Sequence, residues 1–213
     1  MQSRSRRHEA PEVATGRRAP IFVVRGHARA RLGGARLGRL AVPRRRPGGQ
    51  GRHRVVTAPS DAVYYRRSRF TTHLPVDRRY SPAHYWLLEE SPGIWRVGLT
   101  RFATRMLGDI VDFEFGTPQG AHIAVGDEIG GIEGLKAVTS VYAVGSGRFL
   151  GEGAPLRQNV TLVETDPYGE GWLYRLQGTP AEDVVDVHGY VAILDATIDK
   201  MLASRHAAGD DRD

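Results

Sequence analysis

The chain has 213 residues, no cysteine, and a formal net charge of +6 from 30 basic and 24 acidic side chains. The lack of cysteine excludes disulfides, thiolate metal sites and cysteine nucleophiles, and no apolar run approaches the roughly 18 residues that span a bilayer. The basic charge lies at one end, because residues 1–79 carry 20 − 4 = +16 and residues 80–213 carry 10 − 20 = −10. We therefore expect a basic leader, an acidic folded body and no membrane partner.

Residues 1–79 are predicted to form a disordered leader. The first 54 residues are rich in Arg, Gly, Ala and Pro, and their only sustained apolar patch is residues 21–24. Such a composition cannot bury enough apolar surface to offset the entropy lost on ordering.

Three explanations compete for the leader. The favoured explanation is an over-extended gene start, in which translation begins near Val63 or Val76. The protein would then be cytoplasmic and bacterial. A mitochondrial transit peptide comes second, because Arg-rich, acid-poor starts are typical of that signal. A nucleic-acid-binding arm comes last, since few aromatic side chains are available to stack on bases. These are Tyr64, Tyr65 and Phe70.

The folded domain is expected over residues 80–203, with a polar tail over 204–213. Apolar runs at residues 85–88 and 94–99 flank a turn and predict a β-hairpin. Next, Thr100 can cap a short helix that ends before Gly108.

Further strands are expected in the second half of the domain. Residues 110–115 alternate apolar and acidic side chains, as in a strand with one solvated face. Residues 128–133 and 137–144 predict a second hairpin, with its tip at 134–136. Other expected elements are a strand at 122–125, a turn at 145–147, strands at 148–150 and 172–176, a capping-box turn at 179–182 and a helix over 190–202.

Many short strands separated by glycine turns, in about 120 residues, predict a mainly β domain that is a sandwich or flattened barrel. The helix at the end is expected to pack one apolar side on a sheet.

Lys136, at the tip of the second hairpin, is unusual in this composition. Only Lys136 and Lys200 are lysines, so 30 − 2 = 28 basic residues are arginine. An amine can be acylated, whereas a guanidinium effectively cannot. A lysine held at a tight tip in an arginine-rich chain therefore indicates a site of modification.

Five ordered motifs resemble the glycine cleavage system H protein family. The tip, residues 133–137 (EGLKA), is similar to the family's lipoyl-attachment hairpin. The other motifs are YSPAHYW at 80–86, VGLT at 97–100, LGDIV at 107–111 and DPYGEGWL at 166–173.

The resemblance implies the barrel-sandwich hybrid fold of lipoyl carriers, with covalent lipoate on Lys136 as N6-lipoyl-lysine. It further implies that Glu133 helps a lipoate ligase or lipoyl transferase to recognise the hairpin. The chain would be a carrier with no catalytic residues, loaded by glycine decarboxylase, unloaded by the aminomethyltransferase and reoxidised by dihydrolipoyl dehydrogenase. No metal site is implied, and the expected role of His84 is packing or capping.

Three positions depart from the family, and one of them is Gly134, which replaces the usual Ser. Tyr85 and Ser140 stand where H proteins have carboxylates that are associated with holding the aminomethyl-loaded arm. This difference favours an alternative, an H-like lipoate-binding protein that carries sulfur intermediates with heterodisulfide-reductase-like partners. A third possibility, from another class, is a β-sandwich interaction module with an unused lysine.

Overall fold

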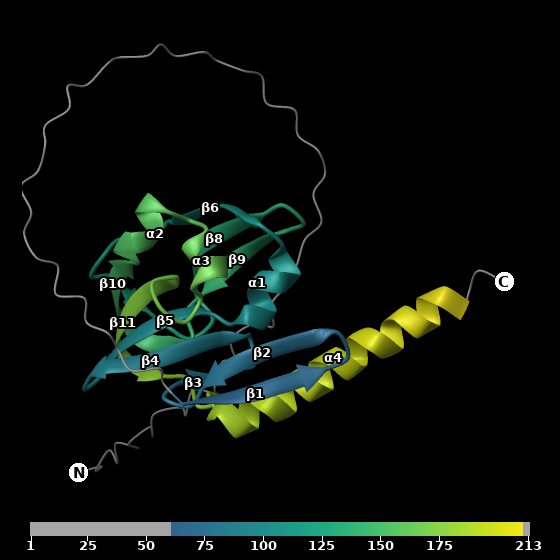
Figure 1. Ribbon diagram of the computed structural model, residues 1–213. Helices are drawn as coiled ribbons and strands as arrows, with labels where there is room; N and C mark the ends of the chain where they lie inside the picture. The colour runs from purple at the N-terminus through teal and green to yellow at the C-terminus, as the bar shows by residue number, and fades with distance from the viewer. Residues whose placement is uncertain (1–60, 211–213) are drawn as a thin grey trace, which may run out of the picture.

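The computed structural model describes residues 61–210, which form three antiparallel sheets and four helices (Figure 1). Within these residues, no helix combines the length and apolar character needed to cross a bilayer. The predicted leader up to residue 60 and the last three residues lie outside the described part.

The largest sheet has six strands and is open at both edges, so the domain is a sandwich and not a closed barrel. In spatial order its strands are β3 (Arg79–Tyr80), β4 (Tyr85–Ser91), β5 (Ile94–Leu99), β11 (Trp172–Pro180), β10 (Gly145–Glu152) and β7 (His122–Ile123). A three-stranded sheet, which carries the lysine hairpin, consists of β6 (Ile110–Phe115), β8 (Glu128–Gly134) and β9 (Val138–Tyr142).

The first three residues of β4 are buried, and they face both sides of the sheet. On one side Tyr85 and Leu87 join the core that also contains apolar residues of the three-stranded sheet, such as Ile132. On the other side Trp86 joins a second core with Tyr190 of the last helix. Because alternate residues of a strand point to opposite faces, β4 contributes to both cores, and the sheet lies between them.

The helices are α1 (Arg101–Leu107), α2 (Ala154–Gln158), α3 (Leu162–Thr165) and α4 (Val187–Asp210). Helix α1 begins after Thr100, as predicted, and Gly108 follows its last residue in a left-handed conformation at φ 76°. The short helices α2 and α3 were not predicted. Helix α4 is longer than the predicted 190–202, and Figure 1 shows its C-terminal part extending past the rest of the domain.

A third, two-stranded sheet contradicts part of the leader prediction. Strands β1 (Ala62–Arg67) and β2 (Phe70–Pro75) pair across a two-residue turn at Ser68 and Arg69. Tyr65 and Leu74 of this sheet are buried against α4. The expected disorder is therefore wrong for residues 62–79, because their alternate apolar side chains are buried in the second core.

Two smaller predictions and the tail boundary are also corrected. The expected turn at 145–147 is the start of β10, where Gly147 faces Gly178 so closely that a Cβ on Gly147 would lie 2.0 Å from the Gln177 carbonyl oxygen. The expected capping box at 179–182 overlaps the end of β11, which continues to Pro180. Residues 204–210, expected in a polar tail, continue α4.

Candidate functional site

Lys136 lies in the segment 135–137 that joins β8 to β9, where it forms a two-residue turn together with Leu135. The loop is closed by a pair of backbone hydrogen bonds, from Gly134 N–H to Ala137 O at 2.8 Å and from Ala137 N–H to Gly134 O at 3.3 Å. Leu135, the other loop residue, is 67 % exposed, and Lys136 is exposed as well. A tight antiparallel turn of this kind holds the lysine backbone at the outer end of the sheet.

The loop is attached to the end of helix α1 by backbone contacts. The N–H of Leu135 donates to Asp109 O at 2.7 Å, and the N–H of Lys136 donates to Leu107 O at 3.2 Å. A Cβ on Gly134 would lie 2.6 Å from the same Leu107 carbonyl oxygen, so this close approach requires glycine. The position of Lys136 is therefore fixed by main-chain atoms on both sides.

The side chain of Lys136 runs along Gly108. A Cβ on Gly108 would be 3.0 Å from both Cγ and Cδ of Lys136, which places the aliphatic stem directly over this residue. The stem enters a cleft of about 560 Å³. The cleft is otherwise lined by Thr71, Arg101, Thr104, Arg105, Asp109, Glu164 and Thr165.

The charged groups of the lysine cleft are only partly paired. Arg101 donates to the backbone carbonyl of Glu164, and the Glu164 carboxylate accepts the backbone N–H of Ile110 at 2.5 Å. Among the residues that the structure describes, neither Lys136 nor Arg105 forms an ion pair. Lys136 is therefore exposed and without an ion-pair partner in the described part of the chain, and it shares its cleft with Arg101 and Arg105.

A series of buried hydrogen bonds connects His84 to the N-terminal cap of α1. His84 is 5 % exposed, and its Nδ1 lies 3.0 Å from the Tyr190 hydroxyl, which lies 2.9 Å from Thr100 Oγ1. Thr100 Oγ1 in turn accepts the N–H of Ala103 and caps the helix. Desolvation lowers the pKa of His84 to about 4. His84 is thus a packed imidazole, in agreement with its predicted role.

Tyr85 and Ser140, the positions of the family carboxylates, do not line the lysine cleft. Tyr85 is a core residue whose hydroxyl accepts the backbone N–H of Tyr142 at 3.3 Å, and burial raises the pKa of this phenol. Ser140 lies half-buried on β9, opposite Gly131 of β8. The acidic side chains near Lys136 are instead Asp109 and Glu164.

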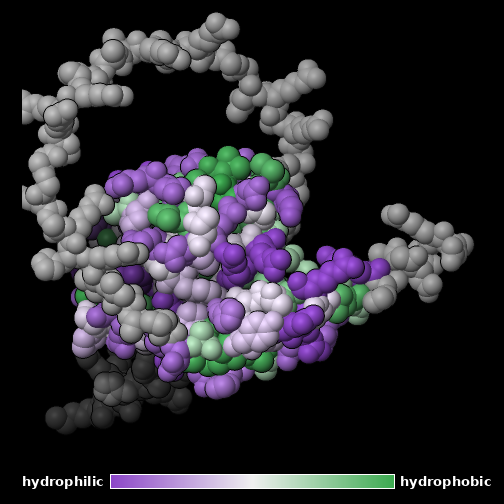
Figure 2. Space-filling view, viewed as in Figure 1, coloured by the Kyte–Doolittle hydropathy of each residue, from purple (hydrophilic) through white to green (hydrophobic). Residues whose placement is uncertain are grey.

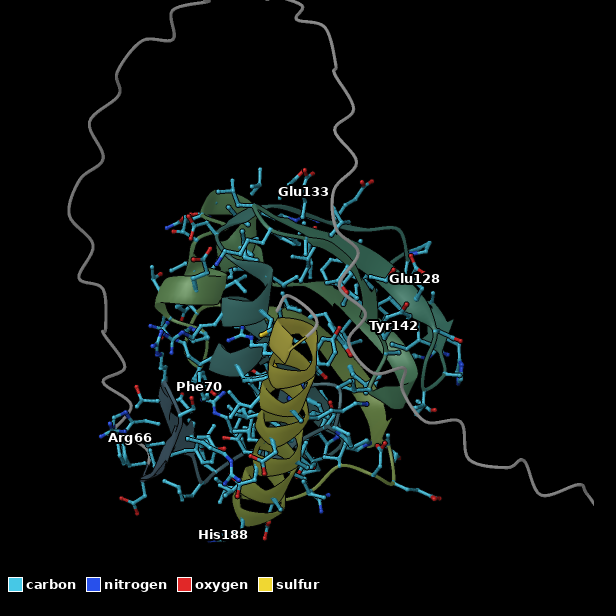
Figure 3. The ribbon with its side chains drawn as sticks, turned by 90° about the vertical axis from the view of Figure 1, so that its right-hand side faces the viewer. Arg66, Phe70, Glu128, Glu133, Tyr142 and His188 are labelled. Carbon is cyan, nitrogen blue, oxygen red and sulfur yellow. The ribbon has the colours of Figure 1, made fainter. Side chains whose placement is uncertain are left out.

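Glu133, the other predicted site residue, is separated from the lysine cleft. It is exposed at the end of β8 and lines a different cavity, of about 580 Å³, along β6 and β8. Asp112, Glu114 and Glu128 share this acidic surface. Figure 3 shows Glu133 at the end of the molecule opposite His188, the second residue of α4. The hairpin thus presents a lysine toward α1 and a carboxylate toward the outer face of the sheet.

Sequence reasoning did not identify most of the cleft wall. Thr71 comes from strand β2, inside the segment expected to be disordered, and Glu164 comes from the unpredicted helix α3. The available signal for β2 was the alternation of Phe70, Thr72 and Leu74, of which Thr72 and Leu74 are buried.

The family model for the glycine cleavage H-protein matches residues 78–194. The glycine cleavage system H protein of Pseudoalteromonas atlantica is 37 % identical over 122 residues, which cover 56 % of this chain and 94 % of the relative. That of Corynebacterium jeikeium is also 37 % identical, over 126 residues, covering 57 % and 97 %.

A solved structure agrees with these sequence matches. The crystal structure of a glycine cleavage system H protein from Mycobacterium marinum superimposes with a TM-score of 0.51 at 30 % identity, and the match covers 56 % of this chain and 97 % of that one. The family model spans more than half of the chain and includes Lys136 with its hairpin. The chain therefore belongs to the glycine cleavage H-protein family.

Proposed function

We propose that this chain is a lipoyl carrier of the glycine cleavage system and that Lys136 carries the lipoyl group. The observation that supports this most strongly is an exposed, unpaired amine on a two-residue hairpin tip, inside a glycine cleavage H-protein domain. The chain has 28 arginines and only two lysines. The tip therefore carries an amine in a chain whose other basic residues, apart from Lys200, are all arginine.

The residues around the tip fit a lipoyl group. A modifying enzyme must reach Nζ, and the flanking residues Leu135 and Ala137 add no charge and little bulk beside it. The stem of Lys136 already lies over Gly108, where the absence of a Cβ leaves room for it. The open cleft beyond provides space for an attached acyl chain.

Lys136 would hold the lipoyl group, which would supply a reducible disulfide as the carrier of an aminomethyl group between glycine decarboxylase and the aminomethyltransferase, with dihydrolipoyl dehydrogenase as the enzyme that restores the disulfide. The chain itself supplies no catalytic group in this proposal. Its backbone contacts from Leu135 and Lys136 to the end of α1 hold a fixed pivot. A tether on a fixed pivot gives each partner a high effective concentration of whatever it carries.

Glu133 is proposed to contribute to recognition by the lipoate ligase or lipoyl transferase. Its carboxylate is exposed at the end of β8, three residues before the lysine, and it belongs to an acidic surface that a basic partner face can read. The ligase would then contact the outer face of the sheet while Lys136 enters its active site.

A glycine-dependent carboxyl exchange assay with purified glycine decarboxylase tests the proposed cargo. The chain is first lipoylated, and Lys136→Arg and Lys200→Arg variants are prepared in parallel. Exchange is expected with the parent and with Lys200→Arg, and not with Lys136→Arg. A fully lipoylated chain that no decarboxylase loads would refute the glycine role and leave the carrier role intact.

A second cargo is favoured by the absence of carboxylates at two family positions. Tyr85 and Ser140 occupy these positions, so an aminomethyl amine on the arm lacks two opposite charges there. The lysine cleft is of mixed charge, because Arg101 and Arg105 line it together with Asp109 and Glu164, and its cations are available to an anionic sulfur cargo. The alternative function is therefore a carrier of sulfur intermediates for a heterodisulfide-reductase-like sulfur oxidation system.

The two cargoes can be separated with the cleft arginines. Replacement of Arg105 by Gln is expected to improve loading of an amine by the decarboxylase if the amine is the cargo, because it removes a like charge. It is expected to weaken retention of an anionic sulfur adduct if sulfur is the cargo. The direction of the change, measured by mass spectrometry of the loaded chain, decides between them.

A further inference from the structure

The N-terminal hairpin and the C-terminal part of α4 form an addition to the family domain. Both lie outside residues 78–194, and they are joined to each other. The Tyr65 hydroxyl donates to Asp195 at 2.8 Å, and Arg67 donates to Asp195 at 2.9 Å and to Asp199 at 2.8 Å. This specific contact makes the added elements one unit with a defined surface.

The added unit forms a small apolar groove with helix α1. The groove has a volume of about 200 Å³, below the roughly 300–1,000 Å³ of typical small-molecule sites. Phe70 of β2 meets Phe102 of α1 edge-on, with 5.4 Å between ring centroids. The apolar lining consists of Phe70, Phe102, Met106, Ile198, Met201 and Leu202. These residues define the hairpin–helix groove, whose size suits one or two side chains of a partner.

Arginines without carboxylate partners surround the hairpin–helix groove. Arg69, Arg105 and Arg205 line it, and none of them forms an ion pair with any residue in the described part of the chain. Figure 2 shows strongly hydrophilic surface where α1 approaches β2 and along α4. Residues 80–213 carry a net charge of −10. The positive charge of the groove rim is therefore opposite in sign to the net charge of that part of the chain.

The hairpin–helix groove adjoins the lysine cleft. Arg105 lines both, and Thr71, next to Phe70 on β2, lines the lysine cleft. A partner that occupies the groove is therefore placed beside Lys136. Met106 and Met201 give the groove an adaptable lining, because thioether side chains tolerate different partner shapes.

We propose that the hairpin–helix groove docks an acidic, amphipathic segment of an enzyme that acts on the Lys136 arm. An apolar side chain of that segment enters the groove, and flanking carboxylates pair with Arg69 and Arg205. Charge complementarity of this kind raises the association rate and selects the partner. This inference rests on the proposed carrier function and adds the surface by which one partner recognises this chain.

A pair of double variants tests the docking surface. Arg69→Glu/Arg205→Glu reverses the rim, and Arg66→Glu/Arg79→Glu makes the same charge change at two exposed positions that do not line the groove. Figure 3 shows Arg66 at the outer side of the hairpin, away from α4. Each lipoylated protein is assayed as substrate of purified glycine decarboxylase, aminomethyltransferase and dihydrolipoyl dehydrogenase at low ionic strength.

For one of these enzymes, the rim variant is expected to raise KM at least tenfold with kcat unchanged, while the control variant behaves as the parent. The same enzyme is expected to shift the methyl signals of Met106 and Met201 in ¹³C-methionine NMR and to leave Met1, the third methionine, unmoved. Equal KM values for rim and control variants with all three enzymes would overturn the docking proposal alone. A parent chain turned over by none of them would overturn the carrier function with it.

Discussion

Acidification is expected to destabilise the domain through His84. The imidazole is buried beside Tyr190, and desolvation lowers its pKa from 6.5 to about 4 in the folded state. The unfolded chain therefore binds a proton that the folded chain does not, as the pH falls below 6.5. The stability that the neutral imidazole contributes is complete above pH 6.5 and is lost as the pH falls toward 4, because unfolding then takes up a proton.

The two pKa values set the size of the effect. Relative to pH 7.5, linkage gives a loss of about 2 kcal/mol at pH 5 and about 3 kcal/mol at pH 4. Other groups titrate in this range as well, so a variant without the imidazole is needed for comparison. His84 has a positive φ of 63°, and asparagine is one of the residues that tolerates this conformation. His84→Asn is therefore the variant that removes the titration and keeps the backbone.

Urea unfolding of the parent and of His84→Asn at pH 7.5, 6, 5 and 4 measures the difference. The parent is expected to lose about 2 kcal/mol more than the variant between pH 7.5 and 5. His122→Asn, at an exposed position of β7, serves as the control and is expected to follow the parent. Parallel curves for the parent and His84→Asn would refute the assignment of a buried neutral imidazole.

Two further predictions concern the hairpin. Gly134→Ala is expected to lower the free energy of unfolding in urea by about 1–3 kcal/mol and to slow lipoylation, because the new Cβ would lie 2.6 Å from Leu107 O. Gly131→Ala is the control and is expected to be tolerated, because its Cβ would have its nearest contact at 3.9 Å. Equal losses of stability for the two variants would contradict the close approach at Gly134. Glu133→Gln is expected to lower the rate of ligase-dependent lipoylation about tenfold, as for a lost charged hydrogen bond of about 1.5 kcal/mol, with unchanged unfolding. Glu128→Gln, on the same acidic surface, is the control, and a similar slowing of both would refute a specific role for Glu133.

The sequence was sufficient to predict the lysine hairpin because local signals agreed there. Glycines bracket two apolar runs, and the structure has β8 and β9 near the predicted positions, with Lys136 in the loop between them. The first hairpin and helix α1 were predicted for the same reason. Turn residues and the Thr100 cap mark their ends, and the structure confirms both.

The sequence was not sufficient where structure depends on distant contacts. The turn at Ser68 and Arg69 contains neither Gly nor Asn, so β1 and β2 lack the usual hairpin signal and resemble the arginine-rich leader in composition. β1 is held in place by hydrogen bonds from Tyr65 and Arg67 to Asp195 of α4, which lies about 130 positions later in the chain. The sequence predicts a turn at Gly147, because its close approach to Gly178 appears only when β10 and β11 are paired.

The lysine cleft combines both cases. Lys136 was identified from local pattern, but Thr71, Arg105 and Glu164 come from three separate elements, so no local pattern could unite them. The cleft wall contributed by β2 lies outside the segment that the family model matches. The contribution of β2 to the lysine cleft is therefore visible only in the folded structure.

Intact and peptide mass spectrometry after expression with a lipoate ligase tests the central claim most directly. Because Lys136 and Lys200 are the only lysines, two variants cover every lysine of the chain. We predict one lipoyl group per chain on the parent and on Lys200→Arg, located at residue 136, and none on Lys136→Arg. A lipoyl group that remains on Lys136→Arg, or a parent that the ligase leaves unmodified, would contradict the account.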